Sequence, residues 1–114
     1  MIPKGISDDL SPLEAEVMNA LISSGQAKVR NIYDVVSKRR KVAITSVAVM
    51  LDRLHVKGFV KRKIETCRGG TRYLYSLKKS TDEIEEDYMR KQVDKLVNTF
   101  GDKAVAYFNE RFKR

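Results

Sequence analysis

Two neighbouring stretches of the chain carry side chains that can bind a polyanion. Thr45 and Ser46 open a predicted helix over residues 45–57, and their hydroxyl groups can hydrogen-bond to bases or phosphates. A predicted hairpin over residues 59–77 follows directly, and five of its side chains are basic. A helix can enter the major groove of a duplex while a basic hairpin beside it contacts the backbone. These stretches therefore indicate nucleic-acid binding.

The side chains that we predict to contact DNA form three groups. The first is a basic cluster before the helix, which could also be a solvated helix end. The second is the outer face of the helix, where the small apolar side chains could instead pack on another helix. The third is the hairpin, whose alternation places neighbouring cations on opposite faces. The full set is Arg39, Arg40, Lys41, Thr45, Ser46, Ala48, Val49, Arg53, Arg62, Lys63, Arg68 and Arg72.

The positive charge is concentrated in the predicted hairpin. The chain has 114 residues and a formal net charge of +8. Residues 1–58 carry nine Lys or Arg and six Asp or Glu, residues 59–79 carry seven and one, and residues 80–114 carry seven and eight. The segments thus have net charges of +3, +6 and −1. A polyanion is the natural partner of such a surface, because its long-range field speeds capture.

Local patterns predict the elements that position these side chains. Ser11 and Glu14 form the capping box of a first helix that ends at Gly25. A brief strand at 27–29 and a second helix at 30–39 follow. The third helix places apolar residues on one face at spacings of three and four, so that face must pack inward. Arg68, Gly69 and Gly70 suit the turn of the hairpin. Three helices and a hairpin predict a mainly α fold with a small β wing, a winged helix-turn-helix over residues 1–79.

Residues 80–114 predict a helical region that mediates dimerisation. Ser80 and Glu83 match a second capping box, Gly101 interrupts the helix near Phe100, and Asp102 can cap a last helix. A helical hairpin of about 33 residues buries little core on its own. Its apolar stripes therefore need another surface, either the N-terminal domain or the same segment of a second chain. We prefer the second chain as our hypothesis. The residues predicted at this interface are Tyr88, Val93, Leu96, Val97, Phe100, Val105, Phe108 and Phe112.

The sequence argues against several other classes of protein. It lacks the HExxH, GxSxG and phosphate-loop motifs, so we do not expect an enzyme. The acidic run at 82–87 suits a helix start rather than a metal site. We interpret His55 as a surface residue, and Cys67 as a passive thiol because the chain has no second cysteine. No apolar run suits a membrane span or a signal peptide. We expect a cytoplasmic protein without cofactor or metal.

Four segments resemble the penicillinase-repressor family, which includes methicillin-resistance and copper-responsive repressors. They are LSPLEAEVMNAL, TSVAVMLDRLHVKGFVKR, GGTRYLYS and LVNTFGDKAVAYFNE, and the resemblance covers roughly residues 10–110. It implies a dimeric transcriptional repressor whose winged helix binds a palindromic operator and whose C-terminal helices dimerise. Thr45 and Ser46 match the Thr-Thr that opens the family's recognition helix. The Leu-x-Arg-Leu core is matched by Leu51, Arg53 and Leu54, and the Lys-Gly turn by Gly58.

The chain also departs from this family's pattern. One spacer residue is missing between Arg72 and Tyr73, so the Arg-x-Tyr pattern of the wing, completed by Tyr75, is matched imperfectly. The C-terminal cysteine cluster of copper-responsive members is absent, as is the Asn-Phe bond cleaved in antibiotic-responsive members. The inducing signal therefore cannot be inferred from the resemblance.

A second hypothesis keeps the fold but changes the partner. The winged helix would be an architectural or protein-interaction module, and the basic hairpin a solvated ribbon. The nearly uncharged outer face of helix 45–57 is compatible with this hypothesis. Binding to DNA at graded salt separates the two, because a DNA-binding protein must lose affinity steeply as salt rises.

Overall fold

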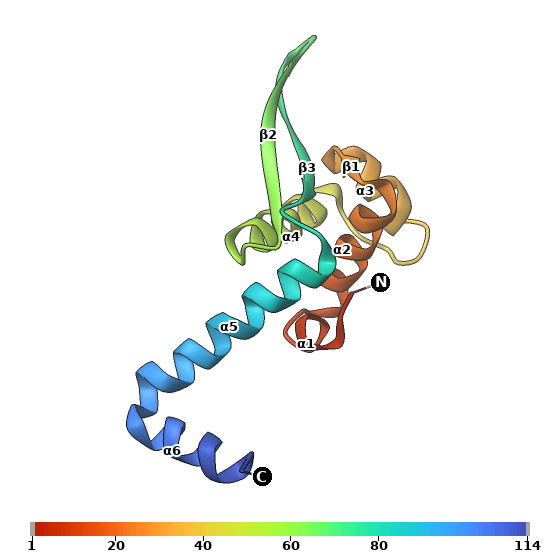
Figure 1. Cartoon of the computed structure of the whole chain (residues 1–114). Coiled ribbons are helices and arrows are strands. Elements are labelled where there is room, and N and C mark those ends of the chain that lie inside the picture. Colours follow the sequence, from red (N-terminus) through yellow and green to blue (C-terminus); the bar gives the residue numbers. More distant parts are fainter. Residues whose placement is uncertain (1, 114) are drawn as a thin grey trace.

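The computed structural model describes residues 2–113 and confirms the predicted fold class. The chain order is helix, helix, strand, helix, helix, two strands and two helices (Figure 1). The bounds are α1 Lys4–Ser7, α2 Pro12–Ser24, β1 Gln26–Ala27, α3 Val29–Val36, α4 Ile44–Val56, β2 Val60–Cys67, β3 Gly70–Leu77, α5 Thr81–Phe100 and α6 Asp102–Arg111. Helices α2 to α4 with the sheet form the winged helix, and α5 and α6 follow it.

Helix α2 begins with the predicted capping box. The Ser11 hydroxyl accepts a hydrogen bond from the Glu14 amide at 3.2 Å, and the Glu14 carboxylate accepts one from the Ser11 amide at 3.1 Å. The second Glu14 oxygen forms an ion pair with Lys57 at 3.0 Å. Lys57 also donates to the Asp9 carbonyl at 3.2 Å. These contacts connect the start of α2 to the end of α4.

The inner face of α4 forms the centre of the hydrophobic core. Val47, Leu51 and Leu54 are fully buried there, as the spacing of three and four predicted. Helices α2 and α3 cover this face with fully buried side chains, and the base of the sheet adds Phe59 and Tyr75. Burying a side chain of this size stabilises the fold by about 1.5–3 kcal/mol. The core thus fixes which face of α4 is directed outward.

The three strands form an antiparallel sheet in the order β1-β3-β2. Gly58 links α4 to β2 with a φ of +85°, a conformation that glycine adopts readily and other residues rarely do. In the hairpin, Arg62 lies opposite Tyr75 and Lys63 lies opposite Leu74. Because side chains alternate along a strand, Arg62 and Lys63 occupy opposite faces of the hairpin, as predicted.

Some boundaries differ from the sequence prediction. The strand at 27–29 lies instead at Gln26–Ala27, and α3 ends at Val36 rather than at residue 39. Four consecutive cations follow Ser37, and like charges at helical spacing disfavour extending the helix through them. Helix α1 was not predicted, although Ile2 and Ile6 are buried. Gly101, not Asp102, occupies the cap position of α6.

The first two turns of α5 belong to the winged-helix core. Ile84 is buried, and the Tyr88 ring packs on Phe59 with 5.5 Å between centroids. Residues just after the predicted boundary at residue 80 thus contribute to the winged-helix core, and the boundary itself stays a prediction. Tyr88, predicted to face a second chain, contacts its own chain because the start of α5 crosses the base of the hairpin.

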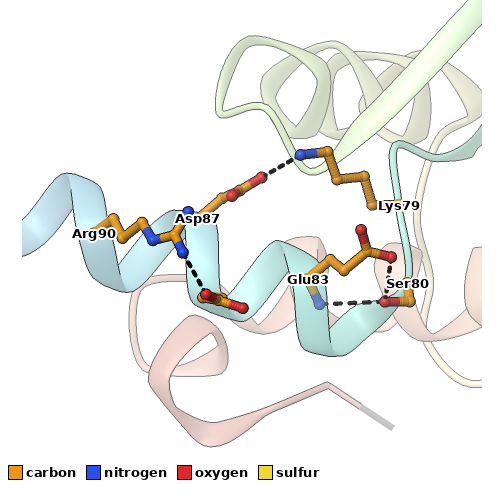
Figure 2. Close-up of polar contacts among 6 residues, drawn as sticks. Lys79, Ser80, Glu83, Asp87 and Arg90 are labelled. Atoms are coloured by element: carbon orange, nitrogen blue, oxygen red, sulfur yellow. Dashed lines mark hydrogen bonds and ion pairs between the residues drawn. The ribbon is translucent and has the colours of Figure 1, made fainter.

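Polar contacts also anchor the start of α5 (Figure 2). Lys79 forms an ion pair with Asp87 at 2.9 Å, and this hydrogen bond keeps the pKa of Asp87 below its ordinary value. The Ser80 hydroxyl accepts from the Glu83 amide at 3.2 Å and donates to the Glu83 carboxylate at 2.9 Å. The second predicted capping box is thus formed only in part, since Glu83 contacts the hydroxyl instead of the Ser80 amide.

The rest of α5 extends away from the winged helix. Figure 1 shows the β2–β3 hairpin leaving the body on one side and α5 on the other, with α6 turning back at its end. The molecule measures 59 × 29 × 21 Å and has a radius of gyration of 17.4 Å. A compact domain of this length has a radius of about 13 Å. The chain is therefore elongated, and two projections extend from its core.

We predict that Glu14→Gln destabilises the fold in a pH-dependent manner. Burial raises the pKa of Glu14, but hydrogen bonds from Lys57 and Ser11 outweigh this effect and leave the pKa below 4.5. The contribution of the carboxylate is thus fully present above pH 4.5 and is lost as the pH falls through the lower folded-state pKa. Urea unfolding at pH 7 should show a loss of about 1–2 kcal/mol.

The matched control is Glu86→Gln, which removes an exposed ion pair with Arg90 on α5. Its cost should stay below about 0.5 kcal/mol, because exposed pairs contribute little. As the pH falls below 4.5 and through the folded-state pKa of Glu14, the difference in stability between Glu14→Gln and the parent protein should shrink. An undiminished difference at pH 3 would show that the carboxylate charge is not what stabilises this junction.

Candidate nucleic-acid interface

The outer face of α4 is free of the core and lies next to the base of the hairpin. Thr45 and Arg53 are exposed, and Val49 is 48% exposed. Ser46 and Ala48 are half-buried at the edges of this face. The exposure of Val49 argues against the alternative that it packs on another helix of the chain, whereas Ala48 remains half-buried. This face offers hydroxyl groups, one guanidinium and small apolar groups, a set that suits close approach to base edges.

Val56 was missed by the sequence analysis, although it also lies on this outer face. Its side chain is 78% exposed at the C-terminal end of α4. Val56 follows Val49 by seven residues, which is about two helical turns, so both lie on one side of the helix. This spacing is the sequence signal that could have identified it. The outer face of α4 is thus more apolar than the predicted set of contact residues implied.

The exposed cations of the hairpin lie along one face and at the tip. Lys61 and Lys63 share the face that also carries Arg72, and all three are exposed. Arg68 is exposed in the turn between β2 and β3, beside Gly69 with a φ of +96°. Cys67 lies next to it, and its thiol contacts the Gly70 carbonyl at 3.4 Å. Arg68 is therefore the cation that reaches farthest from the body.

Arg62, which we predicted to contact DNA, forms contacts within the chain. Its Nη1 donates to Asp52 Oδ1 at 2.9 Å, which joins the hairpin to α4. Its guanidinium also lies over the Tyr73 ring, 4.3 Å from the centroid. Tyr73 in turn meets Tyr75 edge-on at 6.1 Å, so the two tyrosines pack on the ribbon as expected.

The cluster of Arg39, Arg40 and Lys41 does not act as one group. Arg40 binds Glu16 of α2 through Nε at 3.2 Å and Nη2 at 2.9 Å. Arg39 lines a hollow with residues of α2, and Lys41 is exposed without an ion pair among residues 2–113. The sequence could not reveal the Glu16 contact, because its partner lies 24 residues away. Lys41 thus remains the best candidate of the three for a phosphate.

A basic hollow joins the hairpin to the starts of α3 and α4, and the sequence analysis missed two of its residues. The hollow has a volume of about 410 Å³ and includes Lys28, Arg30 and Arg72. Lys28 forms an ion pair with Glu65 at 3.5 Å, while Arg30 is exposed at the first turn of α3. Since cations from two elements converge beside α4, Arg30 joins the candidate contacts to a DNA backbone.

Helices α5 and α6 carry an exposed apolar surface at the far end of the molecule. A groove of about 340 Å³ is lined by Leu96, Phe100 and Phe108, with Tyr107 also in its wall. Phe100 is 58% exposed and Tyr107, which the sequence analysis missed, is 62% exposed. Three other predicted interface residues on this surface are exposed, namely Val93, Val105 and Phe112. Val97 is half-buried.

None of the helices among residues 2–113 combines the length and apolarity that crossing a bilayer requires. In the same residues, the structure brings together no group of three or more side chains that could ligate a metal ion.

Comparison with known proteins identifies the family. The model of the penicillinase repressor family matches residues 10–113, which is nearly the whole chain. The chain belongs to the penicillinase repressor family. It is accordingly a DNA-binding transcriptional regulator with a helix-turn-helix. None of the curated proteins compared matches the sequence significantly.

Solved structures with a similar fold are also regulators. A possible transcriptional regulator from Methanosarcina mazei Go1 has 18% identity and a TM-score of 0.59, covering 82% of this chain and 79% of that one. A PadR family regulator from Clostridium difficile has 18% identity and a TM-score of 0.54, covering 79% and 98%. MarR C80S from E. coli complexed with operator DNA has 19% identity and a TM-score of 0.55, covering 96% and 77%. These likenesses support the winged-helix fold of this penicillinase repressor family member.

We predict that Arg68→Ala and Ser46→Ala affect DNA binding in different ways. Arg68→Ala removes the cation at the tip, so it should weaken binding to all duplexes alike and reduce the salt slope by about 1. Ser46→Ala removes a hydroxyl from the α4 face and should change the preference between sequences with little effect on the slope. Titrations of specific and random duplexes at several salt concentrations measure both quantities. Unchanged affinity of Arg68→Ala for random DNA at low salt would contradict the assignment of the tip.

Proposed function

We propose that this regulator is a dimeric repressor of a palindromic operator, with α4 in the major groove and the β2–β3 hairpin on the adjacent backbone. The observation that carries the proposal is the juxtaposition of the outer face of α4 with the hairpin, which the contact between Arg62 and Asp52 joins at 2.9 Å. One duplex can therefore meet both elements. The comparison with MarR on operator DNA supports DNA as the partner, since the fold is shared.

The electrostatics of this surface support backbone contact. Among residues 2–113, the side chains of Lys41, Lys63, Arg68 and Arg72 are exposed and form no ion pair. Neutralising phosphates with such cations releases condensed counterions, so affinity falls steeply as salt rises. These four cations and Arg30 are therefore the leading candidates for phosphate contact, while Arg40 and Arg62 act within the protein. The exposed Arg39 and Arg53 also stay predicted contacts. Phosphate contacts of this kind set the position of the protein on the duplex without reading its sequence.

The groove face of α4 supports sequence reading by a small number of contacts. Thr45 and Ser46 can hydrogen-bond to base edges, and Val49 can touch a thymine methyl group. Arg53 lies two turns farther along the helix and can reach either a base or a phosphate. Because so few side chains are available, we expect DNA shape to supply part of the sequence preference.

The apolar surface of α5 and α6 supports dimerisation. Its exposed aromatic side chains form a groove that an isolated chain leaves open to water, and burying such groups is the main driving force for association. A second copy is the expected occupant because a two-fold dimer places two recognition helices on one face of DNA, about 34 Å apart. A palindromic operator matches that symmetry. The cytoplasmic location and the lack of a cofactor remain predictions.

We predict that Leu96→Asp disrupts the dimer and, with it, operator binding. Leu96 is 42% exposed in the wall of the groove, so the substitution leaves the winged-helix core intact. A buried, unpaired carboxylate should raise the dimer Kd at least about tenfold. Sedimentation equilibrium measures this change, and gel shifts on an inverted repeat measure its effect on DNA.

The control is Asn98→Asp, which adds the same charge to an exposed position on the opposite side of α5. It should leave the dimer Kd and the operator affinity within about threefold of the parent values. A parent protein that sediments as a monomer at micromolar concentration would contradict the proposal. So would equal effects of the two substitutions.

A further inference from the structure

Arg62 differs from the other cations of the hairpin in its surroundings. It projects from the face of the hairpin that meets α4, and its side chain is 24% exposed. The Tyr73 ring supports its guanidinium at 4.3 Å, and Asp52 accepts its hydrogen bond at 2.9 Å. Lys63, on the opposite face, is exposed and forms no ion pair within residues 2–113. Arg62 is therefore held in one orientation that directs its charge toward the helix.

Asp52, the partner of Arg62, places a negative charge on the outer face of α4. It is the one carboxylate in the sequence of α4, Ile44–Val56. It lies one turn from Val49 and from Val56, so it stands in the middle of the outer face, and its side chain is 59% exposed. A free carboxylate at this position would face the phosphates of a bound duplex and oppose binding. A counter-charge supplied by the protein removes this repulsion.

The geometry suits charge cancellation better than a phosphate contact. A cation that binds phosphate needs its donors turned toward solvent, whereas Arg62 donates to Asp52 and stacks on Tyr73. Moving it to a phosphate would give up both contacts and expose the Asp52 charge at the same time. Such a move gains one attraction and restores one repulsion, so it offers little net benefit.

We propose that Arg62 is a positioning residue that promotes DNA binding through Asp52, by cancelling the carboxylate charge on the outer face of α4, and does not itself neutralise a phosphate. This inference rests on the proposed placement of α4 and the hairpin on DNA. It assigns Arg62 and Asp52 a joint role: together they let a helix that carries a carboxylate approach a polyanion.

The test is a set of five variants, assayed as the full chain on one duplex at several salt concentrations. Arg62→Gln should weaken binding at low salt by about tenfold or more, since a cation is lost and the Asp52 charge is exposed. In Arg62→Gln with Asp52→Asn, both charges are gone, so affinity should return to within about threefold of the parent protein. The salt slope of this double variant should equal that of the parent protein, because no phosphate contact is lost.

Lys63→Gln is the matched control, on the neighbouring residue and the opposite face of the hairpin. It should reduce the salt slope by about 1, as expected for loss of a phosphate contact. The double variant Lys63→Gln with Asp52→Asn should show the same reduced salt slope as Lys63→Gln alone. Urea unfolding of each variant establishes that the proteins assayed are folded.

The outcomes separate the inference from the proposed function. If the double variant binds as weakly as Arg62→Gln and its slope is lower by about 1, then Arg62 contacts phosphate directly and the inference is overturned. If Lys63→Gln, Arg62→Gln and Asp52→Asn all leave DNA binding unchanged, the placement of the hairpin and α4 on DNA is itself wrong. Recovery of both affinity and slope in the double variant supports the role of Arg62.

Discussion

The burial of one face of α4 is the constraint on which the rest of the structure depends. Val47, Leu51 and Leu54 are fully buried against α2, α3 and the base of the sheet. Truncating Leu51 or Leu54 to alanine typically costs about 2–5 kcal/mol, a large share of the stability of a small domain. Because this face is fixed inward, the opposite face is fixed outward. The short link through Gly58 connects the end of α4 to the start of β2. This link places the hairpin beside the outer face of α4.

The basic side chains of the winged helix differ in whether they are exposed or paired with carboxylates. The cations at the tip and on one face of the hairpin are exposed, whereas Arg62 and Arg40 are paired with carboxylates of the same chain. Formal net charge therefore overstates the number of groups available to a phosphate backbone. The end of the molecule opposite the hairpin carries the exposed apolar groove of α5 and α6 instead (Figure 1). The elongated shape separates a surface for a polyanion from a surface for a second chain.

Much of the fold could be predicted because its signals are local. The Ser11–Glu14 capping box, the inner face of α4 and the glycine turn of the hairpin each lie within a few residues, so propensity and spacing determine them. The candidate site was harder, because its electrostatics depend on partners distant in sequence. Asp52 lies 10 residues from Arg62 in sequence. Tyr88 packs on Phe59, although both strands of the hairpin lie between them in the chain. A residue's type gives its charge, but the fold determines whether that charge is free.

The central claim is that two copies of α4, each supported by its hairpin, read one symmetric site on DNA. Selection of bound sequences from a pool of random duplexes, with the full chain, tests this claim most directly. The account predicts an enriched inverted repeat whose half-sites are about 10–10.5 base pairs apart, centre to centre, or a multiple of that spacing. Recovery of no enriched sequence, or of a single half-site without a repeat, would contradict the account. The first result would favour an architectural winged helix, and the second a reader that acts as a single copy.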